Sequence, residues 1–261
     1  MKNISVILSD LDGTLFRNDK TISEYTKQMI AQAQKKGVLF GICTARAKVN
    51  AVKFLKGLAP DFLITNGGGM VTRCNKGSFD GERIYTCEFS VEEVRTLINA
   101  AFETCGPEVI ISVDNENGLY SNSTEELGDK FWTYNDFSDF REPCMKLCVE
   151  TLDKEKVEKI AGSLGAHTLD YLPFSDIPWY KFTKKEATKE YAILALCKYL
   201  NITPEQLTAF GDDFNDIGML KLCGKGIAMK NAIPQVQQVA DQVCAANEED
   251  GVARWIEENI L

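Results

Sequence analysis

The stretch Ile4-Ser-Val-Ile-Leu-Ser-Asp-Leu-Asp-Gly-Thr-Leu15 joins an apolar run to two aspartates, Asp10 and Asp12. The run over residues 4–9 predicts a short buried strand. Alternate residues of an extended chain point to the same side, so both carboxylates face one small volume if the strand geometry continues. Two negative charges held so close together repel each other, so the pKa of one of the two carboxyl groups rises unless a cation is bound beside them. The stretch is therefore consistent with a divalent metal beside an acid–base pair. The alternative is a simple turn, because Asp-Gly is a common turn dipeptide.

The segments that follow alternate between helix and strand. They are a helix that begins in the capping box Thr21–Glu24 and ends at Gly37, a strand over 38–43, a helix over 47–57 and a strand over 61–65. Short links between such elements indicate a parallel α/β sheet, and ligands of these sheets gather at the carboxyl ends of the strands. Asp10, Thr44 and Asn66 all fall at such ends.

This alternation stops at about residue 81 and resumes at about residue 186. The segment between them predicts strands over 108–113, 118–121, 145–151 and 167–182, and helices from the capping box at Ser90 to Cys105 and over 153–164. Beyond it we expect helices over 188–200, from 215, over 232–240 and over 251–259, and strands over 207–210, 226–229 and 242–245. We therefore predict an α/β fold: a Rossmann-like parallel-sheet core of residues 1–80 and 186–261, with an inserted α+β domain of residues 81–185.

Length and composition restrict the class of protein. The 261 residues are 44% hydrophobic and 26% charged, as in soluble globular proteins. A net charge of −9 argues against nucleic acid or an acidic membrane surface as a partner. The N-terminal apolar run is too short for a signal peptide or a membrane span. Nine cysteines without a C-x-x-C pair indicate reduced thiols in a cytoplasmic protein, and the single histidine, His167, excludes a histidine-rich metal site.

A second acidic cluster follows the predicted strand over 207–210. Gly211-Asp-Asp-Phe-Asn-Asp216 places three aspartates and an asparagine within five positions. Oxygen ligands without histidine or thiolate indicate Mg²⁺. The alternative is an acidic helix N-terminus, which the helix dipole favours. That alternative does not explain a second acidic cluster at another strand end.

Magnesium bound by carboxylates usually indicates a phosphate ligand. Thr44 offers a hydroxyl and a backbone N–H to a phosphoryl oxygen, or is a simple helix cap. A cation is also needed to offset charge on a transferring phosphoryl group. Lys189 is the candidate, because the dipole disfavours a lysine at a helix start and another reason for its presence is needed. Lys184 and Lys185 are close competitors.

Four of these features occur in the order of the four motifs of the haloacid dehalogenase superfamily. They are Asp-Leu-Asp-Gly-Thr at 10–14, Thr44, Lys189 and Gly-Asp-Asp-Phe-Asn-Asp at 211–216. The sequence most closely resembles the Cof-type sugar-phosphatase branch, with a type IIB cap inserted between the second and third motifs. Further stretches that look like signatures of this family are Ile64–Gly68, Ile227–Ala232 and Asn247–Ala253. Ala45 and Glu190 depart from the pattern, since the family usually or often has glycine there.

The resemblance implies a role for each site residue. Asp10 would be the nucleophile that forms an aspartyl-phosphate, and Asp12 would protonate the leaving oxygen and then activate water. Mg²⁺ would be held by Asp10, the Asp12 backbone carbonyl and Asp212, with Asp216 in support. Thr44 and Lys189 would bind the phosphoryl group, and Asn215 would help to position that group or the lysine. The substrates implied are small phosphorylated metabolites, above all sugar phosphates, and the insert would act as a lid.

Other functions remain open from the sequence. Within enzymes they are a phosphomutase or a phosphatase for a non-sugar metabolite. A phospho-acceptor signalling module also clusters aspartates at strand ends, but it has about half this length and no insert. A nucleotide-binding scaffold lacks support because neither G-x-G-x-x-G nor a P-loop is present. In the insert, five aromatic side chains are expected to pack its core rather than line a pocket: Phe131, Trp132, Tyr134, Phe137 and Phe140.

Overall fold

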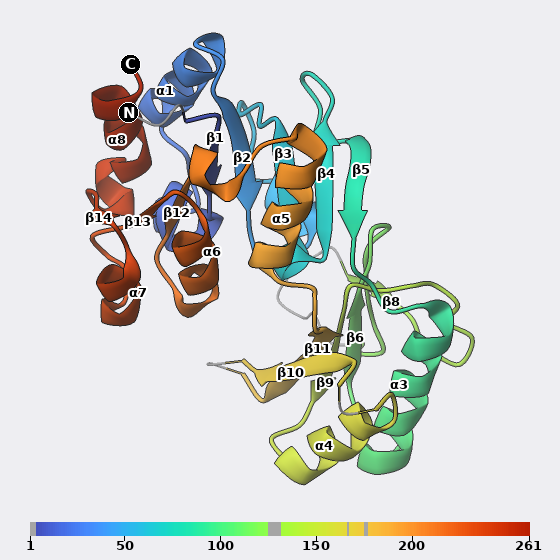
Figure 1. Cartoon of the computed structure of the whole chain (residues 1–261). Helices are drawn as coiled ribbons and strands as arrows, with labels where there is room; N and C mark the ends of the chain where they lie inside the picture. Colours follow the sequence, from blue (N-terminus) through green and yellow to red (C-terminus); the bar gives the residue numbers. More distant parts are fainter. Residues whose placement is uncertain (1–3, 125–131, 166, 175–176) are drawn as a thin grey trace. The chain divides into compact units, whose positions relative to one another are not determined.

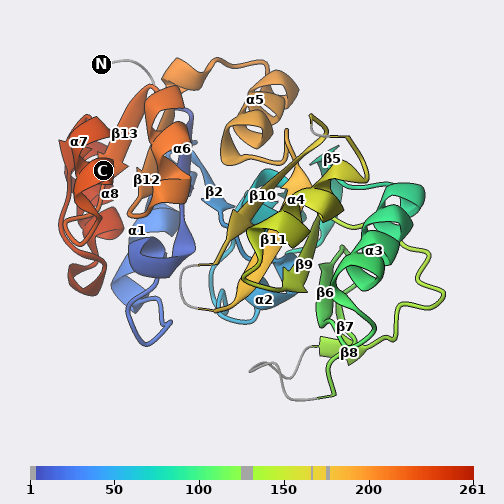
Figure 2. The same cartoon turned by 90° about the horizontal axis from the view of Figure 1, so that it is seen from below.

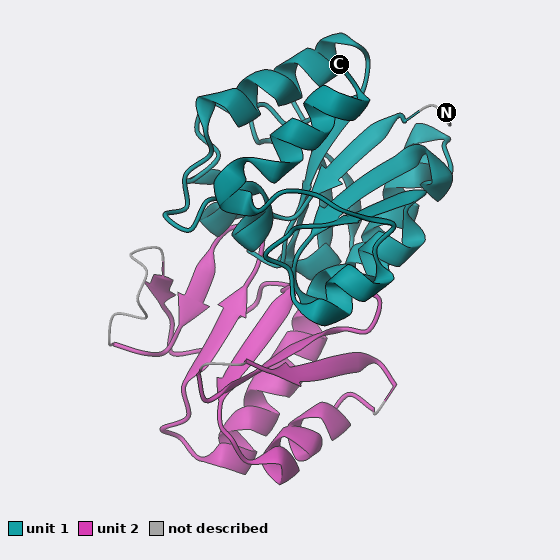
Figure 3. Ribbon diagram, turned by 90° about the vertical axis from the view of Figure 1, so that its left-hand side faces the viewer, with its two compact units in different colours: residues 1–86, 188–261 teal, residues 87–187 magenta. Residues whose placement is uncertain are grey.

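The computed structural model describes residues 4–124, 132–165, 167–174 and 177–261. They form two units, one of residues 1–86 and 188–261 and one of residues 87–187, and each unit has its own sheet (Figure 3). The predicted boundaries, after residues 80 and 185, lie a few residues too early. Gly81–Thr86 forms strand β5, which pairs with β4 (Met70–Cys74) in the sheet of the first unit. The turn between these strands folds the chain back, so the insert begins only after β5.

The first unit is built on an eight-stranded sheet (Figure 1). In order across the sheet its strands are β14 (Gln242–Val243), β13 (Lys225–Ala228), β12 (Leu207–Gly211), β1 (Val6–Ser9), β2 (Leu39–Cys43), β3 (Phe62–Thr65), β4 and β5. The strands from β14 to β3 are parallel, and β4 and β5 continue the sheet as an antiparallel hairpin. Val6, Ile7 and Leu8 are fully buried, because β1 is central and helices cover both faces of the sheet.

Six helices belong to this unit within the described residues. They are α1 (Glu24–Lys35), α2 (Lys48–Val52), α5 (Lys189–Leu200), α6 (Ile217–Leu222), α7 (Pro234–Val239) and α8 (Gly251–Asn259). The connections β1–α1–β2 and β12–α6–β13 leave the centre of the sheet in opposite directions. Since such connections are right-handed, α1 and α6 cover opposite faces (Figure 2). The direction therefore reverses between β1 and β12, and a crevice for ligands is expected at their carboxyl ends.

Two helices of the first unit differ from prediction. Helix α1 begins after Ser23, whose hydroxyl accepts a hydrogen bond from the Thr26 N–H at 3.0 Å, so the predicted capping box at Thr21 is wrong by two residues. Helix α2 ends at Val52 rather than near residue 57. The chain beyond it makes tight turns, such as the bond from Leu55 N–H to the Val52 carbonyl at 3.1 Å, and these do not continue an α-helix.

The described residues of the second unit form a six-stranded sheet and two α-helices. The strands, in order, are β10 (Leu169–Pro173), β11 (Trp179–Lys184), β9 (Lys146–Glu150), β6 (Ile111–Asp114), β7 (Leu119–Ser121) and β8 (Trp132–Tyr134), and the helices are α3 (Val91–Cys105) and α4 (Lys154–Gly162). The predicted capping box at Ser90 and Glu93 is confirmed. The single strand predicted over 167–182 is a hairpin of two strands, and β8 was not predicted. No helix in the described ranges is long and apolar enough to cross a bilayer.

Alternate residues give this second sheet two different faces. Ile111, Val113 and Leu147 belong to an apolar cluster that includes residues of α3 and α4. The residues between them are polar, and Asp114 lies opposite Lys146 in the register, with Oδ2 and Nζ 2.6 Å apart. We call this second surface the polar face; its members include Ser112, Asp114, Lys146, Cys148 and Lys181.

The aromatic residues predicted to pack the insert do so only in part. Phe137 and Phe140 are buried in the apolar cluster, with their rings 5.5 Å apart. Trp132 is half-buried and Tyr134 is 59% exposed, because β8 lies at the edge of the sheet. Phe131 lies outside the described residues.

Candidate active site

The first acidic motif leaves strand β1 by a sharp turn. The strand ends at Ser9, the Asp10 N–H bonds the Phe210 carbonyl at 3.0 Å, and a short helical turn begins at Leu11. Gly13 has φ +75, a left-handed conformation that favours glycine. A Cβ at this position would also lie 2.2 Å from Oδ2 of Asp212. The glycine therefore lets the turn after β1 approach the acidic cluster after β12.

Lys189 is the lysine that reaches the carboxylates. It is the first residue of α5, its side chain is 3% exposed, and Nζ donates to Oδ1 of Asp10 at 2.7 Å and to Oδ1 of Asp216 at 2.6 Å. Of its two competitors, Lys184 binds Glu93 in the second unit and Lys185 is exposed. Two carboxylates at a buried helix start explain why a lysine occupies a position that the helix dipole disfavours.

Three carboxylates converge at the ends of β1 and β12. One oxygen from each of Asp10, Asp212 and Asp216 lies within 4.8 Å of the others. The Thr14 hydroxyl donates to Oδ1 of Asp212 at 2.6 Å. Oδ2 of Asp216 accepts from the N–H groups of Asp212 and Asp213 at 2.9 and 3.1 Å, which fixes the turn that carries the cluster. The two acidic motifs, far apart in sequence, thus form one site.

Burial dominates the electrostatics of this site. It raises the pKa of Asp10 to about 7 although Lys189 opposes the shift, and it raises the pKa of Asp212 to about 6. Burial acts against the charge of Lys189 as well, but the Asp10 and Asp216 carboxylates outweigh it and hold the pKa of Lys189 above its usual value. One lysine faces three carboxylates, so a further cation would relieve their repulsion.

The donor set suits Mg²⁺. The side-chain hydrogen bonds of Asp10 and Asp212 within the described part of the chain use Oδ1, which leaves Oδ2 of each open to a cation. Both oxygens of Asp216 are already engaged, by Lys189 and by backbone N–H groups. Carboxylate oxygens alone match a hard cation. Asp10 and Asp212 therefore fit as direct ligands, and Asp216 fits as a support for Lys189 and the turn.

Asp12 lies in a different environment from the one the sequence predicts. Its carboxylate accepts from Nε of Arg46 at 2.5 Å, from Nη2 of Arg46 at 2.7 Å and from Nζ of Lys20 at 2.6 Å. Although burial acts in the opposite direction, these hydrogen bonds lower the pKa of Asp12 below its usual value. The strand geometry that would have placed both carboxylates together ends at Ser9, and Asp12 turns toward two cations instead of joining the three converging carboxylates.

The two remaining predicted residues flank this cluster. The Thr44 N–H bonds the Ile64 carbonyl at 2.9 Å and continues the strand pairing, so the backbone donor predicted for phosphate is already used. Its hydroxyl accepts from the Arg46 N–H at 3.1 Å, and among the described residues we find no bond that this hydroxyl donates, so its proton can serve a ligand. Asn215 is exposed in the turn after β12. Thr44 can therefore offer a hydroxyl but not its N–H.

Glu190 is one of the two departures from the family pattern, and its side chain occupies the space beside Gly218. A Cβ on Gly218 would lie 1.5 Å from Oε1 of Glu190, so the absence of a side chain in α6 makes room for the glutamate. The next residue after Lys189 is thus accommodated without displacing the start of α5. Three other residues were not predicted as parts of the site. Thr14 closes the first motif but received no role, and Lys20 and Arg46 had only a charged side chain close to a motif as a signal.

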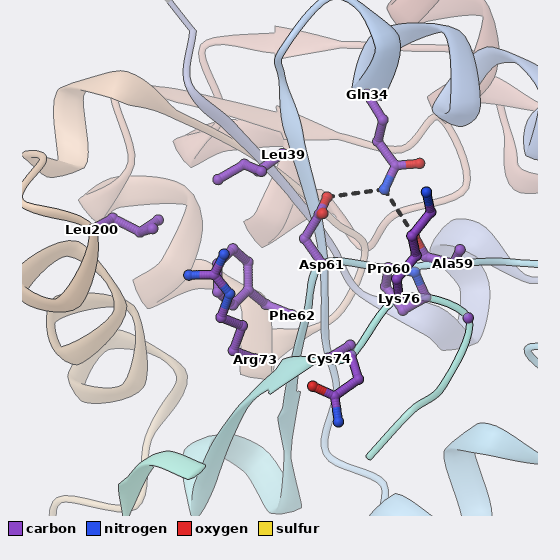
Figure 4. A pocket seen from close by; sticks show the side chains of 12 residues that line it. Gln34, Leu39, Ala59, Pro60, Asp61, Phe62, Arg73, Cys74, Lys76 and Leu200 are labelled. Carbon is purple, nitrogen blue, oxygen red and sulfur yellow. Dashed lines mark hydrogen bonds between the residues drawn. The ribbon is translucent and has the colours of Figure 1, made fainter. Parts of the chain in front are cut away.

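A cavity of about 430 Å³ lies at the amino ends of strands β2 and β3 in the sheet of the first unit (Figure 4). Leu39 and Phe62, at the starts of β2 and β3, line it together with Arg73 of β4. Asp61 in this cavity is held by Nε2 of Gln34 at 2.9 Å and by the Phe40 N–H at 2.8 Å. The predicted site residues lie at the carboxyl ends of the strands instead, so this cavity is separate from the acidic cluster.

The chain is similar in sequence to known phosphatases. Its residues 7–256 match the model of haloacid dehalogenase-like hydrolases. It is 28% identical, over 97% of its length and 96% of the relative's, to a 5-amino-6-(5-phospho-D-ribitylamino)uracil phosphatase of Bacillus subtilis. It is 26% identical to the phosphatase YwpJ of the same organism, over 97% of this chain and 99% of the relative.

Solved structures share the fold. A haloacid dehalogenase-like hydrolase from Bacteroides thetaiotaomicron has a TM-score of 0.82 at 22% identity, over 98% of this chain and 99% of that chain. A sugar phosphatase of subclass IIB of the superfamily has a TM-score of 0.75 at 23% identity, over 97% and 98%. The predicted α/β fold is confirmed by these likenesses. The predicted membership of the haloacid dehalogenase superfamily is confirmed by the family match, and the chain belongs to the haloacid dehalogenase-like hydrolase family.

Proposed function

We propose that this hydrolase is a Mg²⁺-dependent phosphatase that cleaves small phosphorylated metabolites, foremost sugar phosphates, through an aspartyl-phosphate. The observation that carries the proposal is the buried Lys189 ammonium between Asp10 and Asp216, with Asp212 alongside. Such a site combines an ionisable nucleophile, a fixed cation and oxygen ligands for a metal. The relatives named as phosphatases support the reaction class.

In this mechanism Asp10 attacks phosphorus while the bond from phosphorus to the leaving oxygen breaks. Lys189 orients the Asp10 carboxylate and stabilises charge on the phosphoryl oxygens, and the Thr44 hydroxyl donates to one of them. Bound Mg²⁺, held by Asp10, the Asp12 carbonyl and Asp212, would supply further positive charge there. Asp12 delivers a proton to the leaving oxygen and then takes one from the water that hydrolyses the aspartyl-phosphate. Because Arg46 and Lys20 hold Asp12 ionised here, these bonds must loosen during turnover.

A second candidate substrate comes from the relatives. Two of them, 28% and 26% identical to this chain, are named as phosphatases for 5-amino-6-(5-phospho-D-ribitylamino)uracil. A phosphorylated ribityl chain presents the same kind of primary phosphate ester as a sugar phosphate. The proposed chemistry at Asp10 is therefore the same for both, and only recognition of the remaining part of the substrate differs.

We assign that recognition to the insert, residues 87–187, acting as a lid. The proposed chemistry of the first unit accounts for the phosphoryl group alone. The polar face of the second sheet offers charged and hydrogen-bonding side chains, among them Lys146, Asp114 and Lys181.

Nine free cysteines support the predicted reducing, cytoplasmic location.

The test is a panel of phosphate esters assayed with and without Mg²⁺. Hexose and pentose phosphates and a phosphorylated ribityl compound should release phosphate, and EDTA should abolish the release until Mg²⁺ is restored.

Asp10→Asn keeps the shape of the side chain but removes the anion, so turnover should fall by several orders of magnitude while the circular dichroism spectrum is retained. A stable phosphoprotein instead of released phosphate would indicate a signalling module, and an isomerised sugar phosphate would indicate a mutase. Substantial turnover by Asp10→Asn, with deamidation excluded by mass spectrometry, would refute the nucleophile.

A further inference from the structure

Two stretches that the catalytic chemistry leaves without a task meet in the first unit. Asn231 follows β13, and Asn247 precedes α8. The Asn247 N–H donates to Oδ1 of Asn231 at 3.0 Å, which links the two side by side. Asn231 is exposed, whereas Asn247 is buried. A hydrogen-bonded pair of asparagines from distant parts of the chain is thus placed beside the turn after β1.

Both asparagines bind the loop that directly follows Asp12. Nδ2 of Asn231 donates to the Gly13 carbonyl at 2.7 Å. Nδ2 of Asn247 donates to the Phe16 carbonyl at 2.9 Å and to Oδ1 of Asn18 at 3.1 Å. The pair therefore holds one backbone carbonyl inside the helical turn that follows the nucleophile and one directly after it.

The outer part of the loop is fastened to the same region. Nη2 of Arg17 lies 2.7 Å from Oδ2 of Asp250, and the Asn18 N–H donates to Oε1 of Glu248 at 2.6 Å. Lys20 has φ +65, a left-handed conformation that is unfavourable for a residue with a side chain, and its Nζ reaches Asp12. Such a conformation persists only where surrounding contacts impose it, and it often occurs at functional sites.

We propose that Asn231 and Asn247 are positioning residues for Asp12. By fixing the loop of residues 13–20, which we call the acid loop, they set where the Asp12 carboxylate and the Lys20 ammonium lie relative to Asp10. A polar side chain that only stabilised the fold could bind any carbonyl. These two bind carbonyls one and four residues after the proposed proton donor. The inference rests on the proposed function, since it requires that Asp12 transfers a proton.

The experiment compares two substrates whose leaving groups differ. β-Glycerol phosphate releases an alkoxide that must be protonated as it leaves, whereas p-nitrophenyl phosphate releases a stable phenolate that needs no proton donor. Asn231→Asp keeps the oxygen that accepts from Asn247 but turns a carboxylate oxygen toward the Gly13 carbonyl. Misplacing Asp12 should then lower kcat/KM for β-glycerol phosphate on the order of ten- to a hundred-fold, with a much smaller loss for p-nitrophenyl phosphate. Asn247→Ser, which shortens the other donor, should give the same selective loss.

Asn259→Asp is the matched control. Asn259 also donates from Nδ2 to a backbone carbonyl, that of Trp255 at 2.9 Å, but at the end of α8 rather than in the acid loop. It should leave the ratio of the two kcat/KM values unchanged. An Asn231→Asp variant that matches wild type on both substrates, or that loses activity equally on both, overturns the proposal. Asp12→Asn distinguishes a failure of the proposed function from a failure of this inference. If Asp12→Asn does not lose activity selectively on β-glycerol phosphate, the proposed role of Asp12 is wrong. If Asp12→Asn shows the selective loss but the asparagine variants do not, only the positioning role of Asn231 and Asn247 is wrong.

Discussion

At the scale of single residues, the site is organised by one buried ammonium between carboxylates. Burial disfavours charge on Asp10 and raises its pKa to about 7, whereas for Lys189 its two carboxylate partners outweigh burial and raise the pKa. Removing the lysine would leave Asp10 and Asp216 without their cation. In the proposed mechanism, the charge of Lys189 therefore both orients Asp10 and stabilises the transition state.

Lys189→Met tests that contribution. The substitution keeps the length and apolar body of the side chain but removes the charge, so kcat/KM should fall by roughly 100-fold, equivalent to roughly 3 kcal/mol. Lys198→Met is the control, because Lys198 is exposed near the other end of α5. Steady-state rates should separate the two variants when both give the wild-type circular dichroism spectrum. A wild-type rate for Lys189→Met would return the role to another cation.

At the scale of elements, the turn after β1 decides how the two acidic motifs meet. Gly13 combines a left-handed backbone with close approach to Asp212. Gly37, after α1, has a similar φ of +88 but open space around it. At Gly37 only the left-handed backbone favours glycine, whereas at Gly13 the lack of space for a Cβ favours it as well.

Gly13→Ala and Gly37→Ala test this separation. Both should lose stability by about 1 kcal/mol for the left-handed conformation. Only Gly13→Ala should also lose most of its phosphatase activity, because the new methyl group displaces the Asp212 carboxylate. Thermal unfolding and kcat measured on the same preparations give the comparison. Full activity for Gly13→Ala at an unchanged melting temperature would show that the turn tolerates a side chain.

At the scale of the whole molecule, the chain leaves the first unit after β5 and returns at α5, which begins with Lys189. In our proposal, selectivity and chemistry are therefore encoded in separate stretches of the chain. The first unit carries Asp10, Thr44 and Asp212, and the insert carries the polar face. An exchange of the insert should then change which substrates are preferred without changing the reaction.

The exchange replaces residues 87–187 by the corresponding insert of the phosphatase YwpJ. The ranking of kcat/KM across the phosphate-ester panel should move toward that of YwpJ, because the exchanged strands carry the groups that we propose to recognise the organic part of the substrate. Acetyl phosphate, whose organic part is minimal, serves as the control and should be cleaved at a similar rate by both proteins. An unchanged ranking in a well-folded chimera would leave the insert with a shielding role only.

The sequence by itself determined the family, the α/β fold and the positions of the two acidic motifs, because apolar periodicity and short motifs are local properties. It also singled out Lys189, since a lysine at a helix start conflicts with the local dipole. Only the tertiary structure decided which groups meet. Arg46 and Lys20 bind Asp12, Asn231 and Asn247 hold the acid loop, and the Thr44 N–H is taken by Ile64. Such pairings depend on strand order, turn geometry and burial, and residues as far apart as Phe16 and Asn247, 231 positions, become neighbours only when the sheet assembles.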